Sequence, residues 1–393
     1  MVSRERLFYT LLVIVAALGI YTRVTPRFAG VLAMGFDESW YSGYVNVLQR
    51  DGLLAYPRVA QQFIDTEARL DQKIVPPLRL TYIYTAAIWQ RMTGDDAFTS
   101  MKRASCVASL LLMGICFGFG ARLGGRWAGL AMLALVGMAP MQVFMAHRAL
   151  IDGYFSLWST LAMWMTWECL QAPEKRALPM AAGVATALMV MTKETSAFVA
   201  LALLVMLATA HWTRIGTPTW RLYAGILLGG LAGLGILSVA LGGPTVLAEV
   251  LRIDLVKPLA PFTIRFADGP WYHYLLALFI LDPVPMIFAC AGLVALRDDP
   301  RDRFMTLFFV LTYLPMACIP YQAVVRLCTI WDFALAWLAW RMLGEWLRRD
   351  TLLAVGTAVL AGFEFERFYF FFQMCGVYEP VSAILLRCIN IVK

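Results

Sequence analysis

Residues 221–242 read RLYAGILLGGLAGLGILSVALG, and Arg221 carries the only charge among them. A helix needs about 20 mostly apolar residues to cross the hydrocarbon core of a bilayer. The small residues between Gly229 and Gly235 favour the close helix packing that is typical of membrane proteins. This stretch therefore predicts a membrane-spanning helix that packs against a neighbouring helix.

Ten further apolar segments are spread along the 393-residue chain. Hydrophobic residue types make up 61% of it and charged types 15%, against about 45–50% and about 25% in ordinary globular domains. We predict an all-α, polytopic membrane protein with about eleven transmembrane helices, and we exclude a soluble enzyme and a disordered chain. The ten segments are 7–21, 104–120, 127–146, 153–170, 177–192, 196–213, 271–296, 303–320, 327–347 and 352–372.

The basic residues predict the orientation of these helices. The net charge of +7 comes without a basic face interleaved with aromatic residues, so it does not indicate nucleic-acid binding. Lys or Arg occurs in every connection that would be cytoplasmic with eleven spans, and counting 78–92 as a span would move all of these outside. We therefore predict that 78–92 is a juxtamembrane helix in the outer leaflet, within a first extracytoplasmic loop of residues 22–103. A second outer loop would cover 243–270.

An Asp-Glu pair, Asp37 and Glu38, follows the first predicted helix in the segment GFDESWYSGY (35–44). Adjacent carboxylates repel each other, which raises the pKa of one of them and lets it act as a base while the other binds a hydroxyl or a cation. The alternative is that Asp37 only caps a helix that starts near Trp40.

More ionisable residues fall on the predicted outer face, where two spans meet. His147 and Arg148 precede Asp152, and Lys193 stands beside Glu194 between two apolar segments. Lys193 breaks the positive-inside pattern, and its ammonium group suits a lipid phosphate. The alternatives are a helix cap for Asp152, an interfacial position for Arg148 and a weak surface pair for Lys193 with Glu194.

Arg326 lies on the same predicted face, directly before the apolar segment that starts at 327. Its planar guanidinium suits phosphate oxygens, although an Arg at this depth also anchors a helix at the interface. Trp271 and Tyr272 enter another span from outside, where they form either part of an aromatic belt or a face for a sugar ring. Weaker candidates on this side are Lys73, Arg79, Lys102 and Arg103.

In this order, these elements resemble the membrane-embedded GT-C glycosyltransferases, above all bacterial relatives of the protein O-mannosyltransferases and of the aminoarabinose transferases that modify lipid A. The resemblance covers roughly residues 1–345. Its specific parts are D-E-x-x-Y at 37–41 and R-x-x-x-D at 148–152. The weaker matches are Pro76-Pro77-Leu78, Arg103, Pro140, Thr192-Lys193, Gly269-Pro270-Trp271-Tyr272 and Arg326.

The resemblance implies that a hexosyl or pentosyl group moves from a polyprenyl-phosphate carrier to an extracytoplasmic lipid, glycan or protein, with inversion at the anomeric carbon. Asp37 would be the base for the acceptor hydroxyl. Lys193 and Arg326, with Lys73, would hold the carrier phosphate and stabilise its charge as it leaves. The implied location is the bacterial inner membrane, with the active site facing the periplasm.

The same resemblance implies that Asp152, with Glu38 and Arg148, shapes the site. Related oligosaccharyltransferases bind a divalent cation through acidic residues of their outer loops, whereas the mannosyl and aminoarabinosyl branches look metal-independent. We expect no essential metal, and Mg²⁺ or Mn²⁺ is the alternative. Residues 1–347 would form the catalytic module, and 348–393 a C-terminal helix and short outer tail in place of the soluble domain that many relatives carry.

Two other classes of function stay open. A transporter or flippase of a lipid-linked substrate would show charges in the middle of its spans or paired broken helices. A non-catalytic subunit of envelope assembly would use the same fold without a working site. The ionisable groups singled out above gather on one face, which favours the enzyme. The expected partners are the lipid-linked donor, the acceptor and the bilayer, without nucleic acid.

Overall fold

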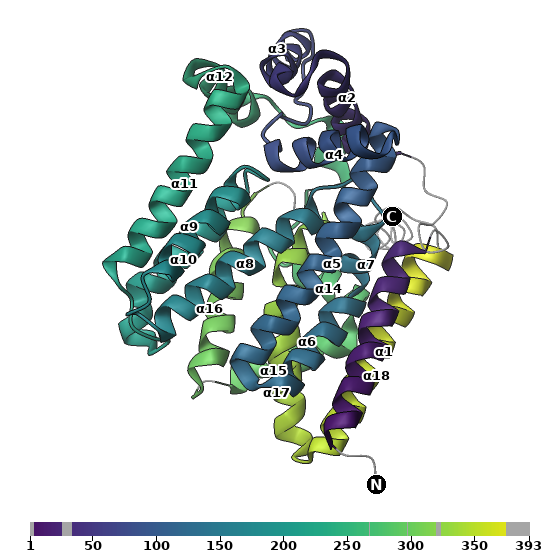
Figure 1. The fold of residues 1–393 in the computed structure, drawn as a ribbon, viewed down its shortest axis with the longest axis vertical. Coiled ribbons are helices and arrows are strands. Elements are labelled where there is room, and N and C mark those ends of the chain that lie inside the picture. The colour runs from purple at the N-terminus through teal and green to yellow at the C-terminus, as the bar shows by residue number, and fades with distance from the viewer. Residues whose placement is uncertain (1–3, 26–33, 267, 297, 320–323, 375–393) are drawn as a thin grey trace.

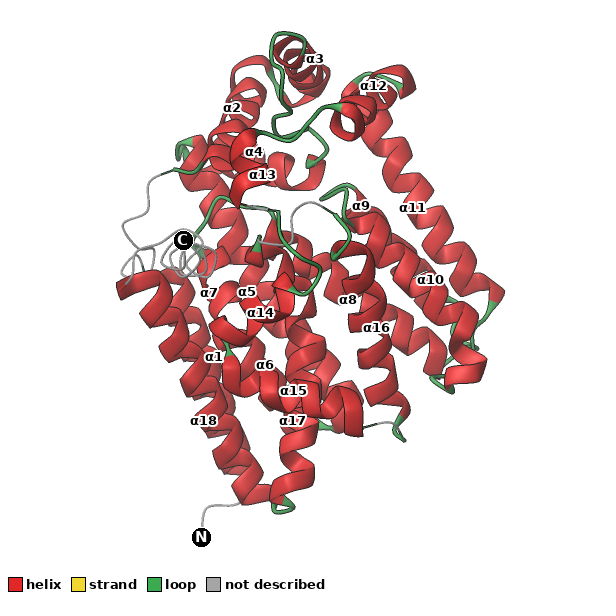
Figure 2. Cartoon of the chain, turned by 180° about the vertical axis from the view of Figure 1, so that it is seen from behind, coloured by secondary structure: helices red, strands yellow, loops and turns green. Residues whose placement is uncertain are grey.

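The computed structural model describes residues 4–25, 34–266, 268–296, 298–319 and 324–374. Every regular element in these ranges is a helix (Figure 2), so the prediction of an all-α fold is confirmed. The predicted outer tail lies mostly outside the described residues, which end at Met374.

Every predicted apolar segment contains a helix or a pair of helices. Seven of these segments correspond to one main helix each: α1 (Arg4–Val24), α5 (Ala97–Gly124), α8 (Asp152–Gln171), α9 (Ala177–Val190), α10 (Ser196–Thr213), α11 (Trp220–Leu241) and α16 (Pro300–Met316). Of the described helices, α1, α5, α10 and α11 are long and apolar enough to cross a membrane alone, and a bent pair adds a fifth candidate. The count of eleven spans therefore stays a prediction.

The remaining segments are interrupted. α6 (Arg126–Met138) and α7 (Pro140–Ala146) meet at an angle of 64°, at a proline that cannot continue the hydrogen bonds of the first helix. α14 (His273–Leu281) and α15 (Pro283–Ala295) are separated by Asp282 before another proline. A 3₁₀ segment, η3 (Val325–Trp331), precedes α17 (Asp332–Leu347), and a π-helical turn, η4 (Tyr369–Met374), follows α18 (Asp350–Phe368).

The two predicted outer loops form a helical cap at the end of the molecule opposite the N-terminus (Figure 1). The first loop contains α2 (Phe36–Asp51), η2 (Leu53–Ala55), α3 (Tyr56–Glu67) and α4 (Leu80–Thr93), and the second contains α12 (Pro244–Val256) and α13 (Pro261–Phe266). α4 is the helix predicted for 78–92. It packs on α2 and on α5, and α12 packs on α3, so the loops join each other above the bundle.

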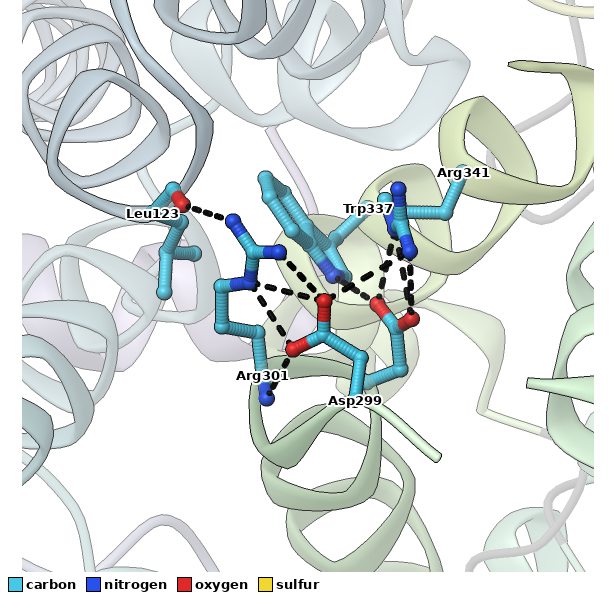
Figure 3. Close-up of polar contacts among 6 residues, drawn as sticks. Leu123, Asp299, Arg301, Trp337 and Arg341 are labelled. Atoms are coloured by element: carbon cyan, nitrogen blue, oxygen red, sulfur yellow. Dashed lines mark hydrogen bonds and ion pairs between the residues drawn. The ribbon is translucent and has the colours of Figure 1, made fainter. Parts of the chain in front are cut away.

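At the predicted cytoplasmic end, a polar network joins the end of α5 and the start of α16 to the middle of α17 (Figure 3). Asp302 accepts hydrogen bonds from Trp337 Nε1 at 2.7 Å and from Arg341 Nη2 at 3.1 Å. Arg301 pairs with Asp299 and donates to the Leu123 carbonyl at 2.6 Å. We call Asp299, Arg301, Asp302, Trp337 and Arg341 the inner network.

Candidate active site

Glu38 ties the start of α2 to the turn between α7 and α8. Its side chain is fully buried and pairs with the guanidinium of Arg148. The backbone N–H groups of Gly35 and Ala149 donate to the same carboxylate at 2.7 and 2.9 Å. A buried carboxylate needs such partners to keep its charge. This geometry gives Glu38 a positioning role: it fixes the helix turn that carries Asp37.

Asp37 lies beside Arg326, a residue of η3. Arg326 Nη2 donates to Asp37 Oδ2 at 2.5 Å, and the Asp37 side chain remains 26% exposed. Arg326 Nε lies 3.4 Å from Oδ2 of Asp152. A single guanidinium therefore joins two carboxylates that come from the first outer loop and from the start of α8.

Asp152 also pairs with Lys193, which comes from the turn between α9 and α10. Both side chains are almost fully buried. The hydroxyl of Thr329 donates to the Arg326 carbonyl at 3.0 Å, which fixes the backbone that carries the guanidinium. We call Asp37, Arg326, Asp152 and Lys193 the outer charge chain. Its two cations already hold carboxylates, and a phosphate group would compete for both of them.

Arg79 adds a third cation beside this chain. It pairs with Glu194 at 2.8 Å and donates to the Tyr41 hydroxyl at 3.3 Å. Burial alone would raise the pKa of Glu194, but Arg79 and Lys193 lower it below its ordinary value. The sequence placed Arg79 only among the weaker outer-face candidates, and its position directly after Pro76-Pro77-Leu78 is a signal that could have ranked it higher.

Lys73 joins the first outer loop to the second. Its Nζ donates to the backbone oxygen of Asp254 at 2.9 Å and lies 3.3 Å from the carboxylate of the same residue. Burial and the nearby Glu194 raise the pKa of Asp254, while Lys73 and Arg79 oppose that shift. Lys73 thus lies near Arg79 and Glu194, but it is engaged by an acid of α12 that the sequence did not single out.

With this geometry in place, the family model described as dolichyl-phosphate-mannose-protein mannosyltransferase matches residues 76–229, less than half of the chain. No curated protein matches the chain in sequence. Among solved structures, ArnT from Cupriavidus metallidurans in the apo state is similar with a TM-score of 0.62 and 15% identity, over 93% of this chain and 76% of ArnT. The chain has the GT-C fold. The resemblance inferred from its motifs is thereby confirmed.

Two further solved structures share this GT-C architecture. ArnT bound to undecaprenyl phosphate has a TM-score of 0.53 and 15% identity, over 92% of this chain and 75% of that one. The oligosaccharyltransferase of Archaeoglobus fulgidus, tethered with an acceptor peptide, has a TM-score of 0.58 and 10% identity. The match covers 93% of this chain and 55% of the archaeal protein.

Other predicted site residues lie apart from the outer charge chain of this GT-C molecule. Arg103 is half exposed and pairs with Asp95 at 3.0 Å. His147 Nε2 lies 2.6 Å from the Thr22 carbonyl, and burial lowers the pKa of this imidazole to about 4. His147 therefore packs as a neutral ring at neutral pH. Within the described residues, no hydrogen bond or ion pair joins His147 or Arg103 to the outer charge chain.

The aromatic candidates Trp271 and Tyr272 are exposed at the start of α14. Their rings meet edge to face with centroids 5.7 Å apart, and the Trp271 carbonyl accepts a hydrogen bond from the Tyr313 hydroxyl at 2.6 Å. Within the described residues, no hydrogen bond, ion pair or ring contact joins them to the outer charge chain. They stay candidates for an aromatic belt or for a sugar-facing surface.

The described side chains also bear on whether the site binds a metal ion. In the described ranges, no group of three or more His, Cys, Asp or Glu side chains lies close enough together to hold a metal ion. Both acids of the outer charge chain instead contact Arg326. The expectation of no essential metal, with a divalent cation as the alternative, stays a prediction.

The structure also adds acids that the sequence did not single out. Asp282, Asp332 and Glu364 occur inside three of the predicted spans, at or near helix interruptions. The ionisable groups of this chain therefore do not all lie on the outer face, as the sequence analysis expected of the candidates it singled out. These acids were not recognised from the sequence because each of them stands alone within a long apolar segment.

Proposed function

We propose that this chain is a membrane glycosyltransferase that moves a sugar from a polyprenyl-phosphate carrier to a hydroxyl-bearing acceptor on the outer face of the bacterial inner membrane. The observation that carries the proposal is the contact of Arg326 with both Asp37 and Asp152 at the predicted outer end of a GT-C fold. The structure of ArnT with undecaprenyl phosphate supports the class of donor.

The proposed reaction uses Asp37 as the base. The acceptor oxygen attacks the anomeric carbon, its proton passes to the Asp37 carboxylate, and the bond from that carbon to the carrier phosphate breaks with inversion. The bonding electrons stay on the phosphate, whose charge Arg326 and Lys193 stabilise. Asp37 suits this role because its side chain is still a quarter exposed, whereas Glu38 is enclosed by its partners.

The donor phosphate also has a consequence for the base. In the structure Arg326 Nη2 donates to Asp37 Oδ2, so this carboxylate oxygen is engaged before any donor binds. A phosphate that binds Arg326 would compete with Asp37 for the guanidinium. The Asp37 oxygen would then be free to accept the acceptor proton when the donor is in place, which limits reaction of the site without its lipid substrate.

The test is transfer of label from a polyprenyl-phosphate sugar by the purified protein in detergent. Asp37→Asn should lower the rate of sugar transfer by about 10²- to 10⁴-fold, because it removes a general base. The rate of donor hydrolysis in the absence of acceptor should fall by the same factor. Asp51→Asn is the matched control, since Asp51 is an acid on the same helix that pairs with Arg50 and Arg58. Equal turnover in the wild type and Asp37→Asn would defeat the assignment of the base.

A transporter of a lipid-linked substrate is the second candidate, favoured by the broken helices and by the acids within the spans. It predicts that the labelled donor binds and crosses the bilayer of a proteoliposome without any transfer or hydrolysis. A non-catalytic assembly subunit predicts neither transfer nor crossing. The same labelled donor therefore separates the three functions.

A further inference from the structure

Three carboxyl groups approach one another inside the helical bundle, away from the outer charge chain. Asp282 stands at the interruption between α14 and α15, Asp332 begins α17, and Glu364 belongs to α18. All three line a single small cavity of about 40 Å³. Charged side chains within a membrane segment are costly, and those that occur there usually serve a function.

The rest of the cavity wall is apolar. It is formed by side chains of α6, α7, α14, α15 and α17, and the proline that breaks α6 from α7, Pro140, belongs to it. The volume is enough for a small number of water molecules. Three acids around an otherwise apolar void are not explained by packing, because a dry cavity of this size is lined by apolar groups alone.

The oxygens around this cavity lack donors. Asp282 Oδ1, Asp332 Oδ2 and Glu364 Oε2 are buried with no hydrogen-bond partner, and the Glu364 side chain is 3% exposed. Outside the cavity lining, the amide oxygen of Gln142, a 1% exposed residue of α7, is also buried without a partner. All four oxygens are acceptors, so each of them needs a hydrogen-bond donor.

The charged surroundings do not balance the acids. Among the described residues, Arg367, also on α18, is the one cation whose charge acts on Asp282. Its guanidinium lies over the Phe371 ring, 4.7 Å from the centroid, and 3.8 Å from the Glu366 carboxylate. Within the described residues, α6 and α7 face the cavity with no charged side chain. Three carboxylates against one guanidinium leave an excess of negative charge.

We propose that Asp282, Asp332 and Glu364 form an intramembrane proton-binding site. Asp282 and Glu364 line the same cavity, and each presents a buried oxygen without a donor, so a proton on one of them would let it donate to a neighbouring acceptor. This proton removes one negative charge and supplies the missing donor. Nothing in the proposal depends on the glycosyltransferase function.

The proton site is linked to the backbone of the outer charge chain. Asp332 directly follows η3 in the chain, and Gln142, whose amide oxygen is buried without a partner, donates to the Thr329 carbonyl of η3 at 3.0 Å. Thr329 in turn holds the Arg326 carbonyl through its hydroxyl. Loss of the proton would therefore disturb η3, the segment that presents Arg326.

Infrared difference spectroscopy of the full chain in detergent tests the proposal directly. Titration between about pH 5 and about pH 9 should reveal the carbonyl band of a buried carboxyl group. This group should still carry its proton at pH values where exposed acids are already ionised. Glu364→Gln and Asp282→Asn should remove or shift this band. Glu366→Gln is the matched control, because Glu366 is a half-exposed acid on the same helix, and it should leave the band unchanged.

Thermal unfolding over the same pH range is the second readout. The wild type should lose several degrees of Tm as the pH rises, whereas Glu364→Gln, which mimics the protonated acid, should keep its Tm. Absence of the band from the wild type, or a band unaffected by both variants, would overturn the proposal. So would a Tm at high pH that sodium restores and choline does not, because the site would then hold a metal cation.

Discussion

The two ends of the molecule both carry charge networks, but the networks differ in how completely they are closed. In the inner network, the Asp302 side chain is 1% exposed and accepts bonds from both Trp337 and Arg341. In the outer charge chain, the Asp37 side chain is 26% exposed. The same residue types therefore serve stability where their bonds are enclosed and remain available for chemistry where one of them is open.

Glu38 is an outer acid, but its surroundings are as enclosed as those of the inner network. Its replacement should therefore affect stability most strongly, as expected for an acid of the inner network. Glu38→Gln leaves the buried Arg148 without this carboxylate and sets an amide N–H against a backbone N–H. The free energy of unfolding should fall by about 3–5 kcal/mol, because one charge of a buried pair is removed. Chemical unfolding measures it. A variant as stable as the matched Asp51→Asn would show that Glu38 does not anchor α2.

Arg326 should show the opposite behaviour, with a larger effect on binding than on folding. Arg326→Ala removes charge-assisted bonds to the proposed donor phosphate, so the affinity for a polyprenyl-phosphate sugar should fall by about 10- to 100-fold. Donor titration measures this change. Arg103→Ala is the control on the same face, and its affinity should be that of the wild type. Equal affinities in all three proteins would remove Arg326 from the donor site.

Asp302 is the counterpart in the inner network. Asp302→Asn weakens the bonds from Trp337 and Arg341, and the free energy of unfolding should fall by about 1–3 kcal/mol. Transfer activity per folded molecule should not change, because the network lies at the far end of the bundle. Thermal unfolding and a transfer assay on the same preparation check both points. A loss of activity at unchanged Tm would contradict the contrast between the two ends.

Glu194 should give the smallest effect, since its side chain is 34% exposed and its pair with Arg79 is screened. Its lowered pKa means that it contributes stability above its unfolded value of about 4.3, and that this contribution is lost as the pH falls below that value. The contribution should be under about 1 kcal/mol. Glu194→Gln should therefore unfold with a shallower acid limb than the wild type, and an identical limb would argue against the ion pair.

The helical segments could be predicted from the sequence because each is a long apolar run that must bury its backbone polar groups. Their interruptions were harder to see, although Ala139-Pro140 and Asp282-Pro283 carry the usual signal of a helix boundary before proline. The proline requires a break in the hydrogen bonding, but only the packing of the neighbouring helices decides whether the chain bends there.

The candidate site was predictable in its members but not in its pairing. Asp37, Asp152, Lys193 and Arg326 stood out as ionisable residues at span ends, and the structure brings all four together. Which acid meets which cation depends on contacts between segments 41 to 289 residues apart, which spacing does not encode. Arg103, one of the weaker candidates on the same predicted face, pairs with Asp95 instead.

The contact of Lys73 with Asp254 bears on how this sequence can change over time. The two positions lie 181 residues apart, and each partner is more than four-fifths buried at the junction of the outer loops. Replacing either residue alone leaves the other charge without this partner. Substitutions at positions 73 and 254 are therefore expected to occur together in related chains, so that the two outer loops evolve jointly at this contact.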